Sequence, residues 1–146
     1  MLELHNIETG YGAGQVLFGV SLAVTAGACV SLMGRNGMGK TTTVRAIMGQ
    51  LPLTSGRISR FGDDRSDRPS FDIARSGIGL VPEGRQVFSN LNVRENLQTF
   101  YRPPSDQKAK VWTYDRVLAL FPGLAKRSKN AGNHLSGGEQ QMLAIG

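Results

Sequence analysis

Alternating apolar and polar positions mark the first segment of the chain. Leu2, Leu4 and Ile7 alternate with polar neighbours, which is typical of a strand with one buried face. A second segment, residues 16–24, alternates less regularly after a glycine-rich turn that contains Tyr11. The pair predicts an antiparallel β layer leading into an α/β core. Apolar runs predict further short strands at residues 28–33, 57–61 and 78–81, the first of them buried.

Apolar residues at helical spacing predict a helix that begins near Lys40. Gly49 and Pro52 predict the end of this helix. Its predicted buried face consists of Val44, Ile47, Met48 and Leu51. Polar residues then predict a surface loop over residues 62–69, followed by a helical turn at 71–75.

From residue 92 the pattern becomes helical. Asn92 is followed three positions later by Glu95, which fits a capping box. Pro103 and Pro104 predict the end of that helix, and Ser105 or Asp106 predicts the cap of the next. The apolar face of this second helix is predicted to hold Val111, Tyr114, Leu118 and Phe121, with Pro122 and Gly123 closing it.

Composition narrows the class of protein. The 146 residues have the length of one ordinary domain, and 40% hydrophobic with 19% charged residues is typical of a soluble globular protein. No apolar run approaches the ~18 residues of a membrane span, and the N-terminus lacks the pattern of a secretory signal. Cys29 is the single cysteine, so we expect no internal disulfide, a reducing compartment and a buried position for this side chain.

The net charge of +6 raises the question of an anionic partner. The basic residues are spread along the chain, and only residues 126–129 approach a cluster, without the interleaved aromatics of a single-strand-binding surface. A solvated face is therefore favoured over a nucleic-acid partner.

A glycine-rich motif follows the run 28–33. Residues 34–41 fit G-x-x-x-x-G-K-[ST], the phosphate-cradling P-loop, between a predicted strand and a predicted helix. Its glycines allow a tight turn whose N–H groups face a phosphate, and the helix N-terminus adds partial positive charge. Lys40 is expected to reach the β- and γ-phosphates, and the Thr41 hydroxyl to bind Mg²⁺. The nucleotide-binding residues are predicted to be Gly34, Arg35, Asn36, Gly37, Met38, Gly39, Lys40, Thr41 and Thr42.

A second motif, Leu135-Ser136-Gly137-Gly138-Glu139, precedes another predicted helix. Its hydroxyl and free N–H groups again suit an anion, although such a sequence alone is usually an ordinary N-terminal turn. Together with the P-loop it resembles the ATP-binding cassette (ABC) ATPases, whose signature is L-S-G-G-[EQ]. The resemblance covers all 146 residues.

The resemblance implies roles for particular residues. Residues 34–42 match the Walker A motif, and Tyr11 matches the aromatic that stacks on adenine, where it would otherwise be an ordinary loop aromatic. Residues 135–139 match the signature, which in this family contacts the ATP held by a second cassette. Glu83 occupies a position where the family usually has a glutamine near Mg²⁺ and the attacking water. A glutamate there keeps an oxygen acceptor and adds negative charge, and we expect it to help order Mg²⁺.

Residues 81–88 look like one branch of the family, the cassettes of branched-chain amino acid importers, with urea importers close behind. In the family, a Walker B strand, its catalytic glutamate and a switch histidine follow the signature helix, and the sequence ends at Gly146 before them. The parallel neighbours of strand 28–33 would come from that later part, so this strand is expected to be an unpaired apolar edge prone to aggregation. His5 and His134 are expected to be ordinary polar residues.

The expected fold class is α/β: a P-loop NTPase core of the cassette type with an N-terminal antiparallel β layer and a helical subdomain, the C-terminal half of the core missing. Residues 1–91 are predicted to form the nucleotide-binding core, 92–134 the helical subdomain, and 135–146 the signature and the start of its helix. The expected function is the ATP-binding subunit of an importer, cytoplasmic and peripheral on the inner face of the plasma membrane. Its implied cofactors are ATP and Mg²⁺.

The implied partners are transmembrane permease subunits, a second cassette and, indirectly, a periplasmic solute-binding protein. By itself the chain is expected to hydrolyse ATP weakly or not at all. Three alternatives stay open: a urea or other amide importer, a module that binds nucleotide without turnover, and a non-transport ABC ATPase acting on nucleic acid. The last has only the basic charge in its favour, because the chain has a short insert and one P-loop.

Overall fold

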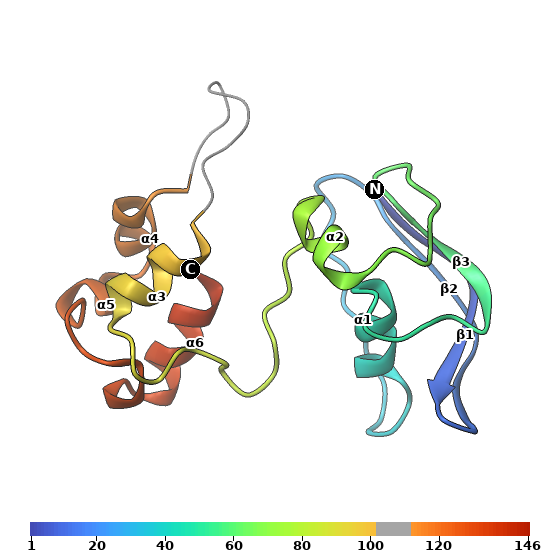
Figure 1. Ribbon diagram of the computed structural model, residues 1–146, viewed down its shortest axis with the longest axis horizontal. Helices are drawn as coiled ribbons and strands as arrows, with labels where there is room; N and C mark the ends of the chain where they lie inside the picture. The colour runs from blue at the N-terminus through green and yellow to red at the C-terminus, as the bar shows by residue number, and fades with distance from the viewer. Residues whose placement is uncertain (102–111) are drawn as a thin grey trace. The chain divides into compact units, whose positions relative to one another are not determined.

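The computed structural model describes residues 1–101 and 112–146. Contacts divide the chain into two compact units, Met1–Leu80 (the sheet unit) and Val81–Gly146 (the helical unit) (Figure 1). This division precedes the predicted boundary between residues 91 and 92, because the segment 81–91 contacts the helices. Val87 packs against the apolar core of the helical unit, and the Phe88 N–H donates to the Asn96 side chain at 2.8 Å.

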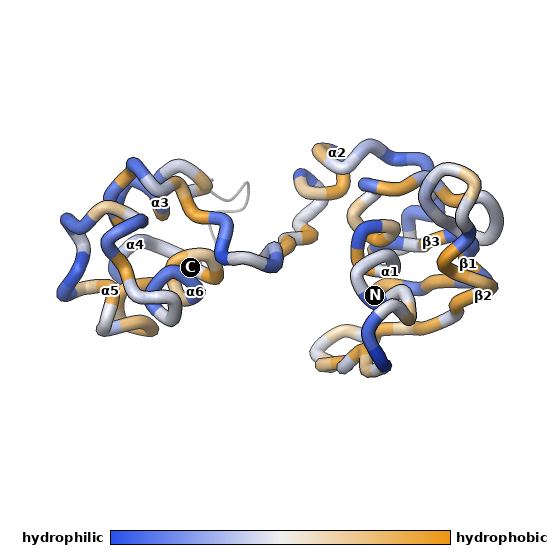
Figure 2. Tube along the Cα trace, turned by 90° about the horizontal axis from the view of Figure 1, so that it is seen from below, coloured by the Kyte–Doolittle hydropathy of each residue, from blue (hydrophilic) through white to orange (hydrophobic). Residues whose placement is uncertain are grey.

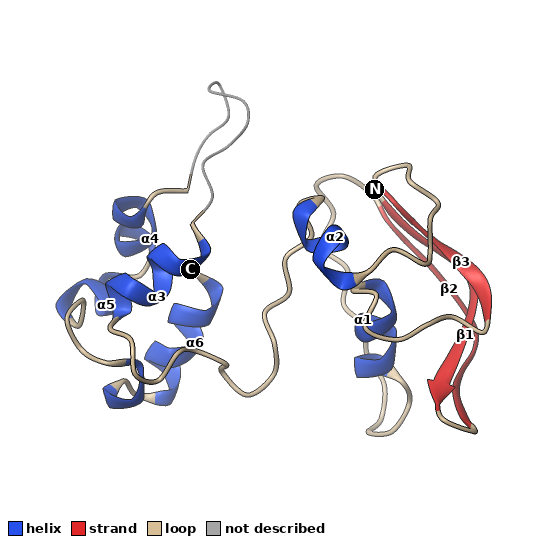
Figure 3. Cartoon of the chain, viewed as in Figure 1, coloured by secondary structure: helices blue, strands red, loops and turns tan. Residues whose placement is uncertain are grey.

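Three antiparallel strands form the sheet, in the order β2-β1-β3 (Figure 3). The strands are β1 (Leu2–Tyr11), β2 (Gly14–Val24) and β3 (Ser55–Arg60). The β1–β2 hairpin pairs Leu2 with Val24 at one end and Tyr11 with Gly14 at the other. The predicted antiparallel layer is therefore confirmed, since its alternating pattern needs only one buried face and a neighbouring strand.

The helix α1 (Lys40–Ile47) contributes to the core of the sheet unit. Apolar residues recur along the strands (Figure 2), and the buried cluster consists of Leu4, Ile7, Leu17, Ala46 and Ile58. The helix ends where it was predicted to, with Gly49 at a φ of 65° that favours glycine. The predicted buried face is wrong at Val44, which is 37% exposed, because α1 buries the side that carries Thr42, Thr43 and Ala46.

Two predicted strands are not formed. Residues 28–33 and 78–81 have no regular secondary structure, and Val30, Leu32 and Met33 are 52%, 43% and 85% exposed. Cys29 is exposed as well, so its predicted burial is also wrong. A strand needs hydrogen bonds from a neighbour, and within the described part of the chain the sheet consists of β1, β2 and β3 only. The predicted helical turn does form, as α2 (Ser70–Arg75).

Short helices around a small apolar core make up the helical unit. They are α3 (Val93–Phe100), α4 (Tyr114–Leu120), α5 (Pro122–Lys126), the 3-10 turn η1 (Gly132–His134) and α6 (Gly137–Ile145). The core holds Val93, Leu124, Leu135 and Leu143. The capping box predicted at Asn92 is confirmed, with Glu95 N–H donating to Asn92 Oδ1 at 2.9 Å and Asn92 N–H donating to Glu95 Oε2 at 2.8 Å.

The helix α4 differs in part from its prediction. Its N-cap is Thr113, whose hydroxyl accepts from the Arg116 N–H at 3.3 Å. Phe121 ends α4, and Pro122 begins α5 at a position that suits its fixed φ. The predictions for Pro103, Pro104, Ser105, Asp106 and Val111 lie outside the described residues. Within residues 1–101 and 112–146, no helix has the length and apolar character required to cross a bilayer.

Candidate functional site

The P-loop segment, residues 34–39, is exposed from Gly34 to Met38 and leads directly into α1 through the buried Gly39. Gly37 and Gly39 have φ values of 84° and 81°, which favour glycine. The Met38 N–H donates to the Arg35 carbonyl at 3.3 Å and closes the turn. The cap residue of α1 is Gly39, so no side chain caps the first N–H groups of the helix. This end of α1 therefore combines backbone donors with the positive end of a helix dipole.

Lys40 spans the loop that precedes it. Its ammonium donates to the Gly34 carbonyl at 2.7 Å and to the Arg35 carbonyl at 2.9 Å. The positive charge is thus held over the turn in which the N–H groups gather, the arrangement that a phosphate requires. The residues present therefore fit a polyphosphate, and the roles expected for the backbone and for Lys40 at the phosphates stay predictions.

The end of the P-loop packs against strand β2. A Cβ on Gly39 would lie 2.6 Å from Leu17 Cδ2 on β2, so only glycine fits at this position. Thr43 is 3% exposed, and its hydroxyl donates to the Gly39 carbonyl at 2.9 Å. These contacts fix the start of α1 against β2, so the phosphate-binding turn has a rigid base.

Tyr11, at the end of β1, is joined to α1 through its hydroxyl group. Arg45 Nη1 donates to that hydroxyl at 3.1 Å, and the Arg45 guanidinium lies over the ring, 6.0 Å from its centroid. A hydrogen bond with Thr42 and then the Arg45 interactions lower the pKa of the Tyr11 phenol. The ring is 44% exposed. Its predicted stacking on adenine stays a prediction, but the structure brings Tyr11 to the same helix as Lys40.

The signature residues lie in the helical unit, at the start of α6. Ser136 caps the helix, and its N–H donates to Glu139 Oε2 at 2.8 Å while Glu139 N–H donates to Ser136 Oγ at 3.3 Å. The Ser136 N–H and hydroxyl are the main cause of a lowered pKa at Glu139. A Cβ on Gly137 would lie 2.3 Å from an Arg85 guanidinium nitrogen, so a larger residue there would displace the Arg85 side chain. Leu135 is 6% exposed and anchors the motif in the core, while Gly138 has open space beside it.

Glu83 occupies a turn in the helical unit, whereas Lys40 and Thr41 lie in the sheet unit. Its predicted role at Mg²⁺ therefore stays a prediction. No three His, Cys, Asp or Glu side chains of the described residues cluster as a metal site, and a nucleotide-bound Mg²⁺ needs none, because phosphates and water supply most of its ligands.

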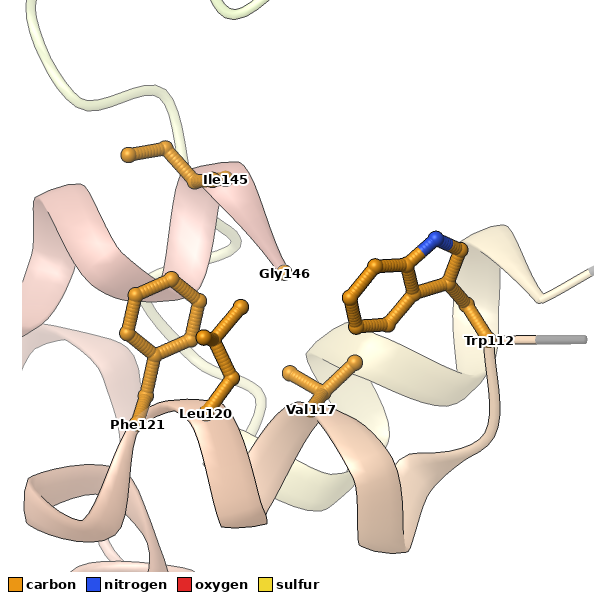
Figure 4. Close-up of a pocket in the computed structure, with 6 residues that line it drawn as sticks. All are labelled: Trp112, Val117, Leu120, Phe121, Ile145 and Gly146. Carbon is orange, nitrogen blue, oxygen red and sulfur yellow. The ribbon is translucent and has the colours of Figure 1, made fainter.

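An apolar cavity of about 350 Å³ lies in the helical unit (Figure 4). In Figure 4 the side chains of Trp112, Val117 and Leu120 face a common space. The remaining lining residues are Phe121, Ile145 and Gly146. None of the six carries a charge, so this cavity does not suit phosphate.

Two partners of the site were not found from the sequence. Arg45 meets Tyr11 across 34 positions, and Arg85 meets Gly137 across a still longer separation. A helical arginine one turn beyond a P-loop has the pattern of an ordinary exposed residue. The only sequence signal for either contact is the glycine at residue 137, since a glycine before a helix can mark a close approach.

Comparison with known proteins shows to which protein family the chain belongs. A sequence profile of the family described as ABC transporter matches residues 17–146. The high-affinity branched-chain amino acid transport ATP-binding protein BraG of Pseudomonas aeruginosa is 43% identical over 148 residues, which cover 100% of this chain and 62% of that protein. The lipopolysaccharide export system ATP-binding protein LptB of Escherichia coli K12 is 34% identical, over 99% of this chain and 60% of that protein.

Solved structures agree with these relatives. A structure described as the ATP binding subunit of an ABC transporter superimposes with a TM-score of 0.82 at 30% identity, over 99% of this chain and 60% of that one. The chain therefore spans about three fifths of the length of the relatives that it matches. The expected cassette fold is confirmed for the part of the cassette that these residues cover.

Proposed function

Because the chain belongs to the ABC transporter family, we propose that it is the ATP-binding portion of an importer's cassette subunit. The observation that carries this proposal is the P-loop geometry. Lys40 lies 2.7 Å and 2.9 Å from two loop carbonyls, above an uncapped helix start. An ATP triphosphate would accept hydrogen bonds from the loop N–H groups and from Lys40, with the Thr41 hydroxyl on Mg²⁺.

Calorimetric titration of the chain with MgATP tests the proposal. Lys40→Ala is expected to weaken binding by roughly tenfold or more, because it removes charge-assisted hydrogen bonds to phosphate. Lys129→Ala is the matched control, since Lys129 is an exposed lysine of the helical unit. Equal affinities for Lys40→Ala and the wild type would contradict the proposal.

We propose branched-chain amino acids as the transported substrate of the whole protein. BraG, the relative that supports this, is 43% identical. The alternatives are urea or another amide and, in view of LptB at 34% identity, lipopolysaccharide export. Uptake of labelled leucine and of labelled urea by cells with and without the gene separates the amino acid candidate from the urea candidate. Leucine uptake that does not depend on Lys40 would count against the amino acid substrate.

Hydrolysis is a separate step from binding. Transition-state stabilisation needs a group that orders the attacking water in addition to the phosphate contacts. The 146 residues contain no segment that matches the Walker B motif after the signature. We infer that these residues alone bind nucleotide and hydrolyse it weakly or not at all, with Glu83 helping to order Mg²⁺ once the whole cassette is assembled. Phosphate release above the level of Lys40→Ala would contradict this inference.

The proposed partners are transmembrane permease subunits and a second cassette, with a periplasmic solute-binding protein acting indirectly, which places the protein on the cytoplasmic face of the plasma membrane. An aromatic surface in the helical unit supports a permease contact. The Phe88 and Phe100 rings stack with centroids 5.7 Å apart and are 44% and 72% exposed, next to Tyr101 at 50%. Exposed aromatic groups of this kind mark interaction sites. Cross-linking from position 100 to the permease in membranes tests the contact.

A further inference from the structure

The hydroxyl group of Tyr11 has a partner set that its expected role as a stacking ring does not require. Stacking on a nucleobase uses only the ring face. In the structure the hydroxyl accepts from Arg45 Nη1 at 3.1 Å, and the Thr42 side chain also interacts with it. Both partners belong to α1, the helix that begins at Lys40. The phenol is therefore tied to the element that carries the phosphate-binding groups.

The geometry of this tie restricts the ring. The Arg45 guanidinium lies 6.0 Å from the Tyr11 centroid, so it contacts the ring face as well as the hydroxyl. Thr42 is 6% exposed, so its contact comes from a fixed side chain of the core. With the ring 44% exposed, surface remains on which a base can stack. A ring held at its far end by two groups of one helix loses little rotational freedom on binding, and such preorganisation raises affinity.

We propose that Arg45 and Thr42 are positioning residues that hold Tyr11 by its hydroxyl, so that the nucleobase is recognised in a fixed relation to the P-loop. The inference rests on the proposed ATP-binding function and deepens it. Base recognition and phosphate recognition then depend on one helix, although Tyr11 and Lys40 come from different elements. The affinity for a polyphosphate without a base would not depend on the contacts of the Tyr11 hydroxyl.

Calorimetric titrations with ATP and with inorganic tripolyphosphate test the inference. Tyr11→Phe keeps the ring and removes the hydroxyl, so ATP affinity is expected to fall about two- to tenfold, the effect of one to two hydrogen bonds. Tripolyphosphate affinity is expected to stay at the wild-type value. Arg45→Met is expected to reproduce the loss for ATP, while Arg45→Lys, which keeps a cationic donor, restores part of it.

Matched controls exist in the helical unit, where Arg94 lies 5.3 Å from the centroid of the Tyr114 ring. Tyr114→Phe and Arg94→Met are expected to leave both affinities unchanged. Combining Tyr11→Phe with Arg45→Met is expected to lower ATP affinity by less than the product of the single effects, because both remove the same contact.

The outcomes separate the inference from the proposed function. Wild-type ATP affinity in Tyr11→Phe, or equal losses for ATP and tripolyphosphate, overturns the inference and leaves the proposed function standing. Failure of the wild type to bind either ligand overturns both. Circular dichroism of each variant shows whether a loss of affinity comes from unfolding. If Tyr11→Phe or Arg45→Met unfolds, the ATP affinity of Arg45→Lys, the mildest change, tests the inference.

Discussion

Arg60 carries a charge at a position that is 1% exposed. Its guanidinium donates to the Ile47 carbonyl at 2.9 Å and to the Ala46 carbonyl at 3.3 Å, at the C-terminal end of α1. A cation at this end also suits the negative end of the helix dipole. Arg60 therefore fastens the end of the P-loop helix to β3.

Replacing Arg60 tests this fastening. Arg60→Met keeps most of the apolar stem and leaves helix carbonyls without a donor, so the sheet unit is expected to lose about 2 kcal/mol of stability. Hydrogen exchange of the α1 amides measures the loss locally. Arg57→Met is the control, because Arg57 is exposed on the same strand. Equal protection of α1 in Arg60→Met and the wild type would show that the contact carries no stability.

Asp63 accepts from two arginines, Arg65 at 2.7 Å and Arg68 at 3.0 Å. The side-chain hydrogen bond from Arg65, followed by its backbone N–H, holds the pKa of the Asp63 carboxyl well below its usual range. A carboxyl whose folded pKa lies below its unfolded value stabilises the fold above that unfolded value. This stability is lost as the pH falls toward the folded pKa.

Asp63→Asn is therefore expected to be less stable than the wild type at pH 7, with the difference shrinking below about pH 4, the ordinary range of an aspartate pKa. Urea unfolding midpoints at pH 7 and pH 3 measure this. Asp64→Asn is the control, because Asp64 is its exposed neighbour. A difference that is the same at both pH values would mean that charge is not the cause.

At the scale of elements, Asn96 joins α3 to the segment that follows Glu83. Its amide is 4% exposed, accepts from the Phe88 N–H at 2.8 Å, and donates to the Phe88 and Leu91 carbonyls at 3.0 Å each. The Asn96 side chain supplies hydrogen-bond partners to the backbone of residues 88–91, as a neighbouring strand does in a sheet. Asn96 therefore helps to order the segment that carries Phe88, together with backbone hydrogen bonds from Gly132 and Asn133.

Asn96→Leu has a similar volume and cannot form these hydrogen bonds. The helical unit is expected to lose about 1–3 kcal/mol, since backbone groups in the segment lose their partners. Trp112, the single tryptophan of the sequence, reports unfolding of this unit by its fluorescence. Asn90→Leu in the exposed part of the same segment is the control. An unchanged unfolding midpoint in Asn96→Leu would rule out this role.

At the scale of the whole molecule, residues 28–33 form an exposed, largely apolar segment. Its apolar side chains are unpaired with any strand of the described residues, and Val30 and Leu32 are 52% and 43% exposed. Exposed apolar backbone with free hydrogen-bonding groups promotes association. We expect these 146 residues to aggregate through this segment.

Val30→Glu combined with Leu32→Glu is expected to lower light scattering several-fold at equal concentration, because like charges oppose stacking of the segment. Phe71→Glu is the control, since Phe71 on α2 is 59% exposed outside the segment. Equal suppression by Phe71→Glu would show that net charge, and not this segment, governs the effect.

Features predicted correctly from the sequence depend on neighbouring positions. The capping box at Asn92 needs only a partner three residues away, the helix start after Ser136 needs only the residues beside it, and the β1–β2 hairpin needs only a short turn. The start of α1 at Lys40 follows from the P-loop motif itself. Such interactions are encoded within a few positions, so a pattern is enough to find them.

The sequence by itself determined the hairpin, the starts of α1, α3 and α6, the P-loop motif and the family. Only the tertiary structure decided that residues 28–33 form no strand, and that Arg45 meets Tyr11, Arg60 meets Ile47 and Arg85 meets Gly137. The physical reason is the same in each case. A strand and a long-range contact both need a partner that lies far away in the chain, and no local pattern specifies whether that partner is in place.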